Sequence, residues 1–277
     1  MGGYTPKEIK YGLGVETMVQ DLAEERTDRD FILGLKKGLA VIECFDDEHE
    51  RLTCADVSVK TGLSRAAARR CLLTLHKLGY AHYDGKLFTL APRVLRLGYA
   101  YLLSASLPQL FQPFLEHLSE QNHASCSAAI LEGDEIVYVA RAATKRIMSM
   151  GLCIGTRLPA YCTSMGRTLL ASLEPEEAMD RLARMERRRL TPWTCTGLDQ
   201  LRTILDEVRQ TGYCVVSQEL EVGLISISVP VFNNAGETVA AVNIASASAR
   251  MNVEDMAPHF LAALLETQKD LRPLIRA

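Results

Sequence analysis

The feature that most constrains the fold lies in residues 53–90, where a short capped helix precedes a basic helix and a glycine-containing ribbon. Thr53 and Asp56 have the spacing of a capping box, which satisfies the free N–H groups that open a helix. The Thr61-Gly62 pair predicts the end of this first helix. Ser64 is then placed as the N-cap of a longer helix, because residues 65–78 contain neither Pro nor Gly.

The longer helix has an apolar face and a cationic face. At about 100° per residue, one side collects Ala68, Cys71, Leu72, Leu75 and Leu78. The other side collects Arg65, Ala66, Arg69, Arg70, His76 and Lys77. Gly79 predicts the helix end, and the following residues predict a hairpin around the two-residue turn Asp84-Gly85. This order of elements is typical of a winged helix-turn-helix.

Positive charge is concentrated in the same segment. Residues 57–83 contain five basic residues and no Asp or Glu, although the whole chain carries a net charge of −3. Arg near the start of a helix in the major groove can read guanine edges, while other Lys and Arg residues contact phosphates. We therefore predict operator DNA as a partner, contacted by Ser64, Arg65, Ala66, Arg69, Arg70, Lys77 and Lys86. The alternative is a solvent-exposed charged face on a winged domain that binds protein.

Composition excludes several other classes. The chain has 277 residues, of which 48% are hydrophobic and 23% charged, as in a globular protein of two domains. We expect a cytoplasmic protein without a membrane segment, because no apolar run approaches the roughly 20 residues that span a bilayer. The eight cysteines show no Cys-x-x-Cys spacing, so we expect most of the thiols to be buried, and we expect no metal and no cofactor. His123 and Cys126 form only an isolated pair, for which core or surface positions are preferred over a metal site.

The periodicity of apolar residues divides the chain into four parts. We predict that residues 1–30 form a mobile tail or an arm that clasps a partner. Residues 31–93 are predicted to form the DNA-binding domain, and its first helix carries Ile32, Leu35, Leu39, Ile42 and Phe45. Residues 94–107 predict a linker helix, and residues 108–277 a second domain. The linker is apolar enough to be a dimer seam, so we expect a dimer or a dimer of dimers, with plain core packing as the alternative.

The second domain alternates strand and helix patterns. Expected strands are 127–131, 136–140, 213–216, 225–232 and 238–245, and expected helices begin after Pro108 and cover 164–173, 175–189, 198–210 and 253–270. The fold class is therefore α+β, with an antiparallel sheet flanked by helices. The segment 159–163 leads directly into a helix near Ser164. Its first N–H groups, on Ser164, Met165 and Gly166, are expected to be free to hold a carboxylate.

Three stretches of this sequence resemble IclR-type transcriptional regulators: LSRAAARRCLLTLHKLGY, GTRLPAYCTSMGRTLLA and GYCVVSQELEVGLISISVPVFNNAGETVAAVNIAS. The resemblance covers residues 31–275 and is strongest to the branch that controls aromatic-acid catabolism through the β-ketoadipate pathway and 4-hydroxybenzoate use. It implies a GAF-like effector domain, a dimeric assembly and an operator occupied by paired winged helices.

The resemblance also implies which residues hold the effector. The family positions that bind small acids fall here on Ser164, Met165, Leu224, Ser226, Asn243 and Ala245. Val216 replaces an acidic residue and Ala245 a serine of relatives that bind short keto acids, which favours a larger, more apolar effector. Tyr138, Met148, Met150 and Leu152 could line the ring side, although ordinary core packing is the commoner role for such residues. The effector class is 4-hydroxybenzoate, protocatechuate or 3-oxoadipate.

Two other functions are compatible with parts of the sequence. Cys162 precedes a helix N-terminus, where a lowered thiol pKa would suit a hydrolase nucleophile, but no His-containing motif supplies a base. We therefore predict that the protein is not an enzyme. A constitutive DNA-binding or scaffolding protein, whose second half only dimerises, is the remaining alternative.

Overall fold

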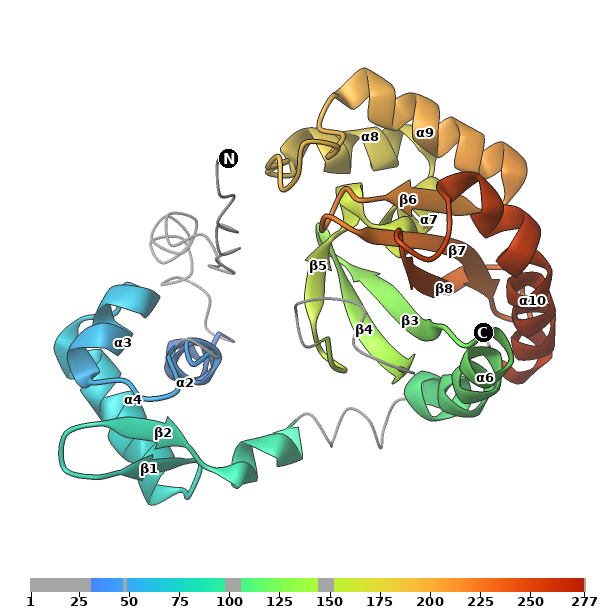
Figure 1. Cartoon of the computed structure of the whole chain (residues 1–277). Helices are drawn as coiled ribbons and strands as arrows, with labels where there is room; N and C mark the ends of the chain where they lie inside the picture. The colour runs from blue at the N-terminus through green and yellow to red at the C-terminus, as the bar shows by residue number, and fades with distance from the viewer. Residues whose placement is uncertain (1–30, 47–48, 98–105, 144–151, 277) are drawn as a thin grey trace. The chain divides into compact units, whose positions relative to one another are not determined.

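The structure is a computed structural model that describes residues 31–46, 49–97, 106–143 and 152–276. The chain divides into two compact units, with the boundary between residues 101 and 102 (Figure 1). The predicted tail, 1–30, and most of the predicted linker helix lie outside the described residues. Among the described residues, no helix has the length and apolar character needed to cross a bilayer.

The N-terminal unit contains the predicted winged helix-turn-helix. Its elements are α2 (Leu33–Glu43), α3 (Cys54–Thr61), α4 (Arg65–Lys77), β1 (Ala81–Tyr83), β2 (Phe88–Leu90) and the 3-10 helix η2 (Pro92–Val94). The capping box is confirmed, since Thr53 Oγ1 accepts from Asp56 N and the Asp56 carboxylate accepts from Thr53 N. Gly62 ends α3 in the left-handed region, at a φ of 67°.

A small apolar core holds this unit together. Val57 of α3, Leu72 of α4 and Phe88 of β2 are buried in one cluster. Leu78 was predicted to be buried but is exposed, because α4 ends at Lys77 and Leu78 turns away as the C-cap. Ala67 is buried instead. The apolar stripe of α2 is also turned outward, with Ile32, Leu35 and Leu39 exposed.

The C-terminal unit is built on a six-stranded antiparallel sheet in the order β5-β4-β3-β8-β7-β6. The strands are β3 (Ser125–Glu132), β4 (Glu135–Ala142), β5 (Arg157–Pro159), β6 (Cys214–Ser217), β7 (Leu224–Phe232) and β8 (Thr238–Ala247). Five of them match the predicted strands. The strand β5 was not predicted. Its three residues form an edge strand that ends at Pro159.

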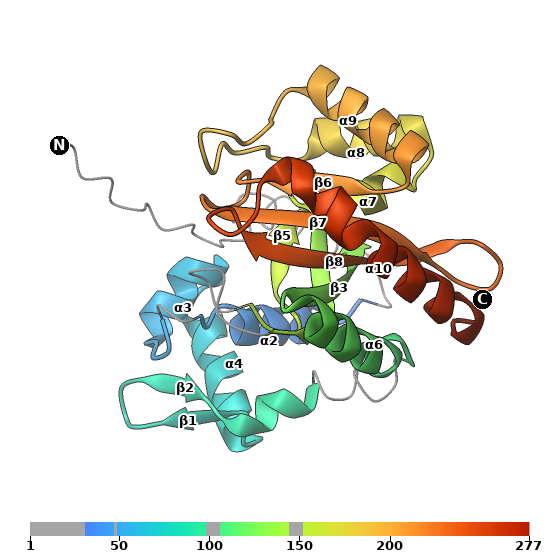
Figure 2. The same ribbon diagram turned by 45° about the vertical axis from the view of Figure 1, so that its right-hand side comes forward.

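Helices cover both faces of this sheet (Figures 1 and 2). One face packs against α6 (Ser106–Asn122) and α10 (Met256–Leu271), which follows the 3-10 helix η4 (Val253–Asp255) and precedes η5 (Arg272–Leu274). The other face packs against the 3-10 helix η3 (Ala160–Cys162), α7 (Ser164–Ala171), α8 (Pro175–Arg184) and α9 (Leu198–Thr211). The α+β class is thus confirmed. The helix predicted over 175–189 stops at Arg184, because Met185 adopts an extended backbone.

Gly166 explains how closely α7 docks on the segment before it. A Cβ atom at this position would collide with the backbone of Ala160 and with the side chain of Thr163. Only glycine therefore permits the observed approach. This contact places the start of α7 directly over the sheet, next to strands β7 and β8.

Candidate functional site

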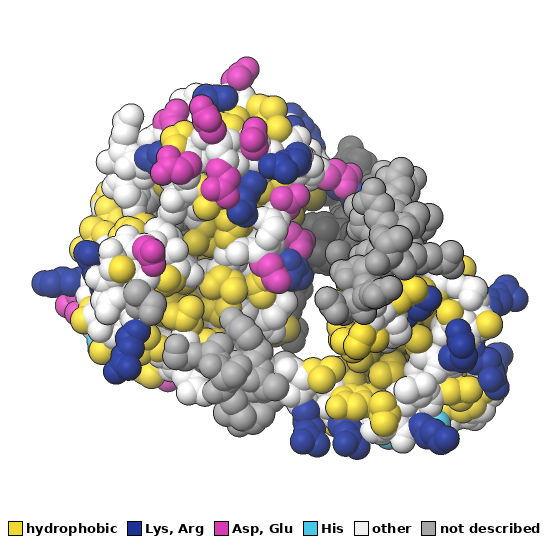
Figure 3. All heavy atoms as spheres, turned by 180° about the vertical axis from the view of Figure 1, so that it is seen from behind, with side chains coloured by type: hydrophobic (Ala, Val, Ile, Leu, Met, Phe, Trp, Pro, Cys, Tyr) yellow, Lys and Arg dark blue, Asp and Glu magenta, His cyan; other side chains and the backbone are white. Residues whose placement is uncertain are grey.

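The cationic face of α4 lies on the protein surface, as predicted. Ser64 caps the helix by accepting from Ala67 N at 3.3 Å. The exposed side chains that follow are Arg65, Ala66, Arg69, Arg70, His76 and Lys77. On the face shown in Figure 3, Lys and Arg side chains rim the N-terminal unit, whereas the visible acidic side chains gather on the C-terminal unit. The helix thus presents a row of cations that a DNA major groove can accept.

Most of these cations have no acidic partner. Within the described residues, no ion pair involves Arg65, Arg69, Arg70, Lys77 or Lys86. Lys60 differs, because its Nζ lies 2.6 Å from Asp46 Oδ2 and donates to the carbonyl oxygen of Cys44. Lys60 is one of the five basic residues of segment 57–83, but its charge is neutralised by Asp46 within the protein.

The wing turn forms one residue later than predicted. The Asp84 carboxylate accepts from Lys86 N at 2.9 Å and from Leu87 N at 2.7 Å, and Asp84 N donates to Leu87 O. The turn is therefore centred on Gly85 and Lys86, because the Asp84 side chain replaces its own carbonyl as the acceptor. Asp84 also pairs with Arg51 at 2.5 Å, and Lys86 is exposed at the tip.

A cavity lies between the sheet and the start of α7 in the C-terminal unit. Its walls comprise Ser125, Ser127, Tyr138, Arg141, Leu152, Cys162, Thr163, Ser164, Met165, Val216, Glu219, Leu220, Leu224, Ser226, Asn243 and Ala245. The predicted effector residues in the described part of the chain all lie on it: Ser164, Met165, Leu224, Ser226, Asn243, Ala245 and Tyr138. Met148 and Met150 lie outside the described residues.

Strand register places polar side chains in one row across the cavity face of the sheet. Arg141 of β4 is paired with Ser127 of β3, Ser127 with Asn243 of β8, and Asn243 with Ser228 of β7. The neighbouring row carries Ser125, Ala245, Ser226 and Val216. The cavity therefore has a polar row next to a mixed row. In the mixed row Ala245 and Val216 are apolar, which is the pattern expected for a more apolar effector.

Several polar atoms of these rows are left without partners. Among the described residues, Ser125 Oγ, Arg141 Nε and Asn243 Oδ1 are buried and make no hydrogen bond. Arg141 Nη1 donates to Leu152 O at 2.8 Å, but no carboxylate in the described residues pairs with this guanidinium. Buried polar groups without partners are rare in folded proteins, and they point to a bound ligand. Arg141 and Ser125 were not predicted as site residues. Strand pairing brings them to this cavity, and the pairing is not visible in the sequence.

The start of α7 offers fewer free N–H groups than predicted. Thr163 is the N-cap, and its Oγ1 accepts from Gly166 N at 3.2 Å. The N–H of Gly166 is therefore not available to an anion, contrary to the prediction. Ser164 and Met165 remain on the cavity wall, where Ser164 Oγ accepts from Ser226 Oγ.

The environment of Cys162 contradicts its expected reactivity. Its thiol is fully buried, and burial raises its pKa to about 12, outweighing the lowering effect of the nearby Arg167 guanidinium. A hydrolase nucleophile needs the opposite shift. His123 and Cys126 gather no ligand set either, since the described residues contain no group of three His, Cys, Asp or Glu side chains suited to a metal.

The cavity is small in this conformation. Its volume is about 30 Å³, which is room for about two water molecules. A ring-containing acid therefore fits only after some of the lining side chains have moved.

Two family models together match most of the chain. The model described as the IclR helix-turn-helix domain matches residues 34–85, and the model described as the bacterial transcriptional regulator IclR C-terminal domain matches residues 99–272. The chain is 44% identical to the Pca regulon regulatory protein of Pseudomonas putida, an alignment that covers 88% of this chain and 84% of that protein.

Two solved structures are similar to the present one. A transcriptional-regulator crystal structure from Rhodococcus sp. RHA1 is 49% identical, with a TM-score of 0.77, covering 87% of this chain and 97% of that one. The inducer-binding domain of an Acinetobacter PobR double mutant, in complex with 3-hydroxybenzoic acid, is 36% identical with a TM-score of 0.59. That comparison covers 62% of this chain and all of the domain.

Proposed function

The chain belongs to the IclR family of bacterial transcriptional regulators, and on that premise we propose that a small aromatic or β-keto acid, bound in the cavity, changes its affinity for operator DNA. In this proposal Ser64, Arg65, Ala66, Arg69, Arg70 and Lys77 of α4 contact the major groove, and Lys86 contacts the backbone from the wing. Their exposure and their lack of acidic partners in the described residues support these roles.

One observation carries the effector proposal: three buried polar atoms without partners, including the Nε of a cation, face a cavity with apolar walls. Arg141 can bind a carboxylate by a charge-assisted hydrogen bond, and Ser125 can add a second. Asn243 Oδ1 is an acceptor and suits a hydroxyl group of the same ligand. Met165, Leu224 and Ala245 provide the apolar wall for a ring or a carbon chain.

The relatives support a small carboxylic acid of this class. The PobR inducer-binding domain was solved with 3-hydroxybenzoic acid, and the Pseudomonas relative is named for the Pca regulon. We propose 4-hydroxybenzoate, protocatechuate or 3-oxoadipate as the effector of this chain. A constitutive DNA-binding protein without an effector would gain nothing from the unpartnered Arg141 Nε, which is why the regulated form is preferred.

We propose in addition that the protein acts as a dimer or a dimer of dimers. The exposed apolar side chains of the N-cap Ile32 and of Leu35 and Leu39 on α2 support self-association, because such a stripe is costly to leave in water. The domain boundaries at 93/94 and 107/108 remain part of this proposal, as does a cytoplasmic location.

The test is isothermal titration of the full-length protein with the three acids and with 4-hydroxybenzyl alcohol as a neutral control. Saturable binding of an acid, with binding of the alcohol weakened by at least roughly tenfold, is expected because the alcohol offers no charge to Arg141. Absence of saturable binding for all three acids would overturn the effector proposal. Equal affinity for acid and alcohol would overturn the role of Arg141.

A further inference from the structure

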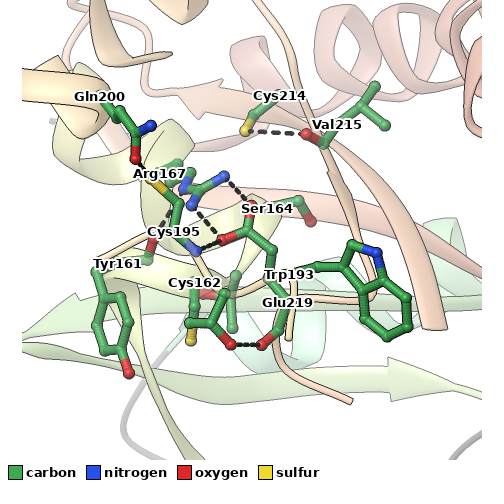
Figure 4. Close-up of polar contacts among 12 residues, drawn as sticks. Tyr161, Cys162, Ser164, Arg167, Trp193, Cys195, Gln200, Cys214, Val215 and Glu219 are labelled. Atoms are coloured by element: carbon green, nitrogen blue, oxygen red, sulfur yellow. Dashed lines mark hydrogen bonds and ion pairs between the residues drawn. The ribbon is translucent and has the colours of Figure 1, made fainter. Parts of the chain in front are cut away.

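A buried ion pair joins α7 to the loop between β6 and β7. Arg167 Nη1 lies 2.6 Å from Glu219 Oε1, and Arg167 Nη2 lies 2.7 Å from Glu219 Oε2. Arg167 is only 2% exposed and also donates from Nε to the carbonyl oxygen of Tyr161. Figure 4 shows the guanidinium and the carboxylate facing each other, with the Cys195 backbone beside them.

The loop that carries Glu219 forms one wall of the cavity. We call residues 218–223 the β6–β7 tip; within it Glu219 and Leu220 line the cavity, and Leu224 follows as the first lining residue of β7. The tip is wound tightly, because Gln218 has a φ of 58° and its N–H donates to Leu224 O at 2.6 Å. A non-glycine residue in the left-handed region stores strain, a feature that clusters at ligand clamps.

The same loop is bonded on its outer side to a second segment, residues 191–195, which we call the connector turn. Glu219 Oε2 accepts from Cys195 N at 2.7 Å, and Thr194 Oγ1 donates to Glu219 O at 2.7 Å. Thr191 Oγ1 donates to Gln218 O at 2.7 Å. The connector turn exposes Trp193, which is 53% accessible and the single tryptophan of the chain.

These contacts form a continuous path from the cavity to the surface. The cavity must widen to admit a ring-containing acid, and most of its other lining residues lie on strands of the central sheet, on η3 and at the start of the buried helix α7, with Leu152 in the loop before β5. The β6–β7 tip belongs to no strand or helix, so it can move with less loss of packing than the strands and α7 can. Because Glu219 bonds to both α7 and the connector turn, a shift of the tip changes its bonds to both.

Stability alone does not explain the ion pair. Taking two charges out of water costs about as much as their attraction returns, so a buried pair is weak evidence for a stabilising role. The side-chain and backbone bonds of Glu219 to Arg167, Thr194 and Cys195 link segments distant in sequence, which is the arrangement expected of a group that fixes one geometry among several.

We propose that Glu219 is a positioning residue that couples occupancy of the cavity to the conformation of the connector turn. The inference rests on the proposed effector function. Arg167 holds the Glu219 carboxylate in place. A ligand in the cavity contacts Leu220 and Leu224 and shifts the β6–β7 tip, and the connector turn then changes its conformation. The pairing with Arg167 neutralises the Glu219 charge in this conformation, which limits its repulsion of an acid bound to Arg141.

The experiment is a titration of the full-length protein with each of the three acids, followed by calorimetry and by selectively excited Trp193 fluorescence. Trp193 does not line the cavity, so a shift of its emission maximum and of its quenching by iodide measures transmission rather than contact. In the wild type both should change in proportion to calorimetric saturation. Glu219→Gln should weaken binding roughly tenfold and abolish most of the fluorescence response at saturation. Glu186→Gln, which breaks an exposed pair with Arg188, is the matched control and should behave as the wild type.

A second variant keeps the test decisive if Glu219→Gln fails to fold. Thr191→Val with Thr194→Val removes the hydroxyl bonds between tip and connector turn, and with them the bond from Trp193 N to Thr191 Oγ1, but leaves the ion pair intact. It should bind the acid within about twofold of the wild type and lose the Trp193 response. Wild-type binding with an unchanged Trp193 spectrum, or an unchanged response in folded variants, would overturn the coupling and leave the effector proposal standing. Absence of calorimetric binding of any of the three acids to the wild type would overturn both.

Discussion

Ser226 Oγ donates a hydrogen bond to Ser164 Oγ across 2.9 Å, joining β7 to the first residue of α7 inside the cavity. Both side chains are buried, and both were predicted as effector-binding residues. Their bond aligns the start of α7 with the sheet. It also means that each hydroxyl has part of its hydrogen-bonding capacity left for a ligand.

Ser226→Ala should therefore weaken acid binding by about 0.5–1.5 kcal/mol, because one of the two aligned hydroxyls is lost. Calorimetric titration measures the change. Ser172→Ala is the control: its hydroxyl donates to Thr168 O at the far end of α7, away from the cavity. Equal losses in the two variants would show that the effect comes from the packing of α7 and not from the cavity.

Arg141→Gln should weaken acid binding by about 1.5–3 kcal/mol, because a charged donor to the carboxylate is replaced by a neutral one. Affinity for a neutral analogue should change much less. Arg157→Gln is the matched control, since Arg157 pairs with Glu132 and Glu135 at the exposed edge of the same sheet, on β5. Full affinity of the Arg141→Gln variant for the acid would contradict the proposal that Arg141 binds the carboxylate.

The recognition helix should show two kinds of DNA contact. Arg65→Ala and Arg69→Ala should each weaken operator binding by about 1–3 kcal/mol and relax base preference. Lys86→Ala should weaken binding to all sequences and lower the salt slope by about one unit. Lys60→Met is the control and should leave the salt slope unchanged, because Lys60 is already paired with Asp46. Electrophoretic mobility shifts at several salt concentrations separate these outcomes.

Cysteine labelling should follow burial and thiol pKa. Burial raises the pKa of Cys162 to about 12 by disfavouring the thiolate, which is the reactive form. Cys162 should thus resist iodoacetamide in the native protein from pH 7 to pH 9 and react only after unfolding. Cys153, the exposed cysteine, should react first. Mass spectrometry that finds rapid native labelling of Cys162 would reopen the hydrolase hypothesis.

Local signals predicted the DNA-binding unit well. The caps at Thr53 and Ser64 act within three residues, so their sequence spacing alone places α3 and α4. The errors came from competing local bonds. The Asp84 side chain shifted the wing turn by one residue, and the C-cap position of Leu78 turned this side chain to solvent.

The cavity was only partly predictable. Family resemblance supplied Ser164, Ser226 and Asn243, whose side chains do meet on one cavity. Arg141 lies near the end of a strand in an ordinary alternating pattern, and only the pairing of β4 with β3 and of β3 with β8 brings it into the polar row. The bonds of Glu219 to Arg167 and Cys195 span 52 and 24 residues, so no local pattern indicated them.

The central claim is that acid binding and operator binding are coupled. The most direct measurement is the affinity of the full-length protein for its operator, located by footprinting, with and without saturating 4-hydroxybenzoate, protocatechuate or 3-oxoadipate at fixed salt. We predict that one of these acids changes the operator dissociation constant by roughly 5- to 150-fold, and that Arg141→Gln loses most of this change at an acid concentration that just saturates the wild type. An operator affinity that is unaltered by every acid that binds would contradict the account.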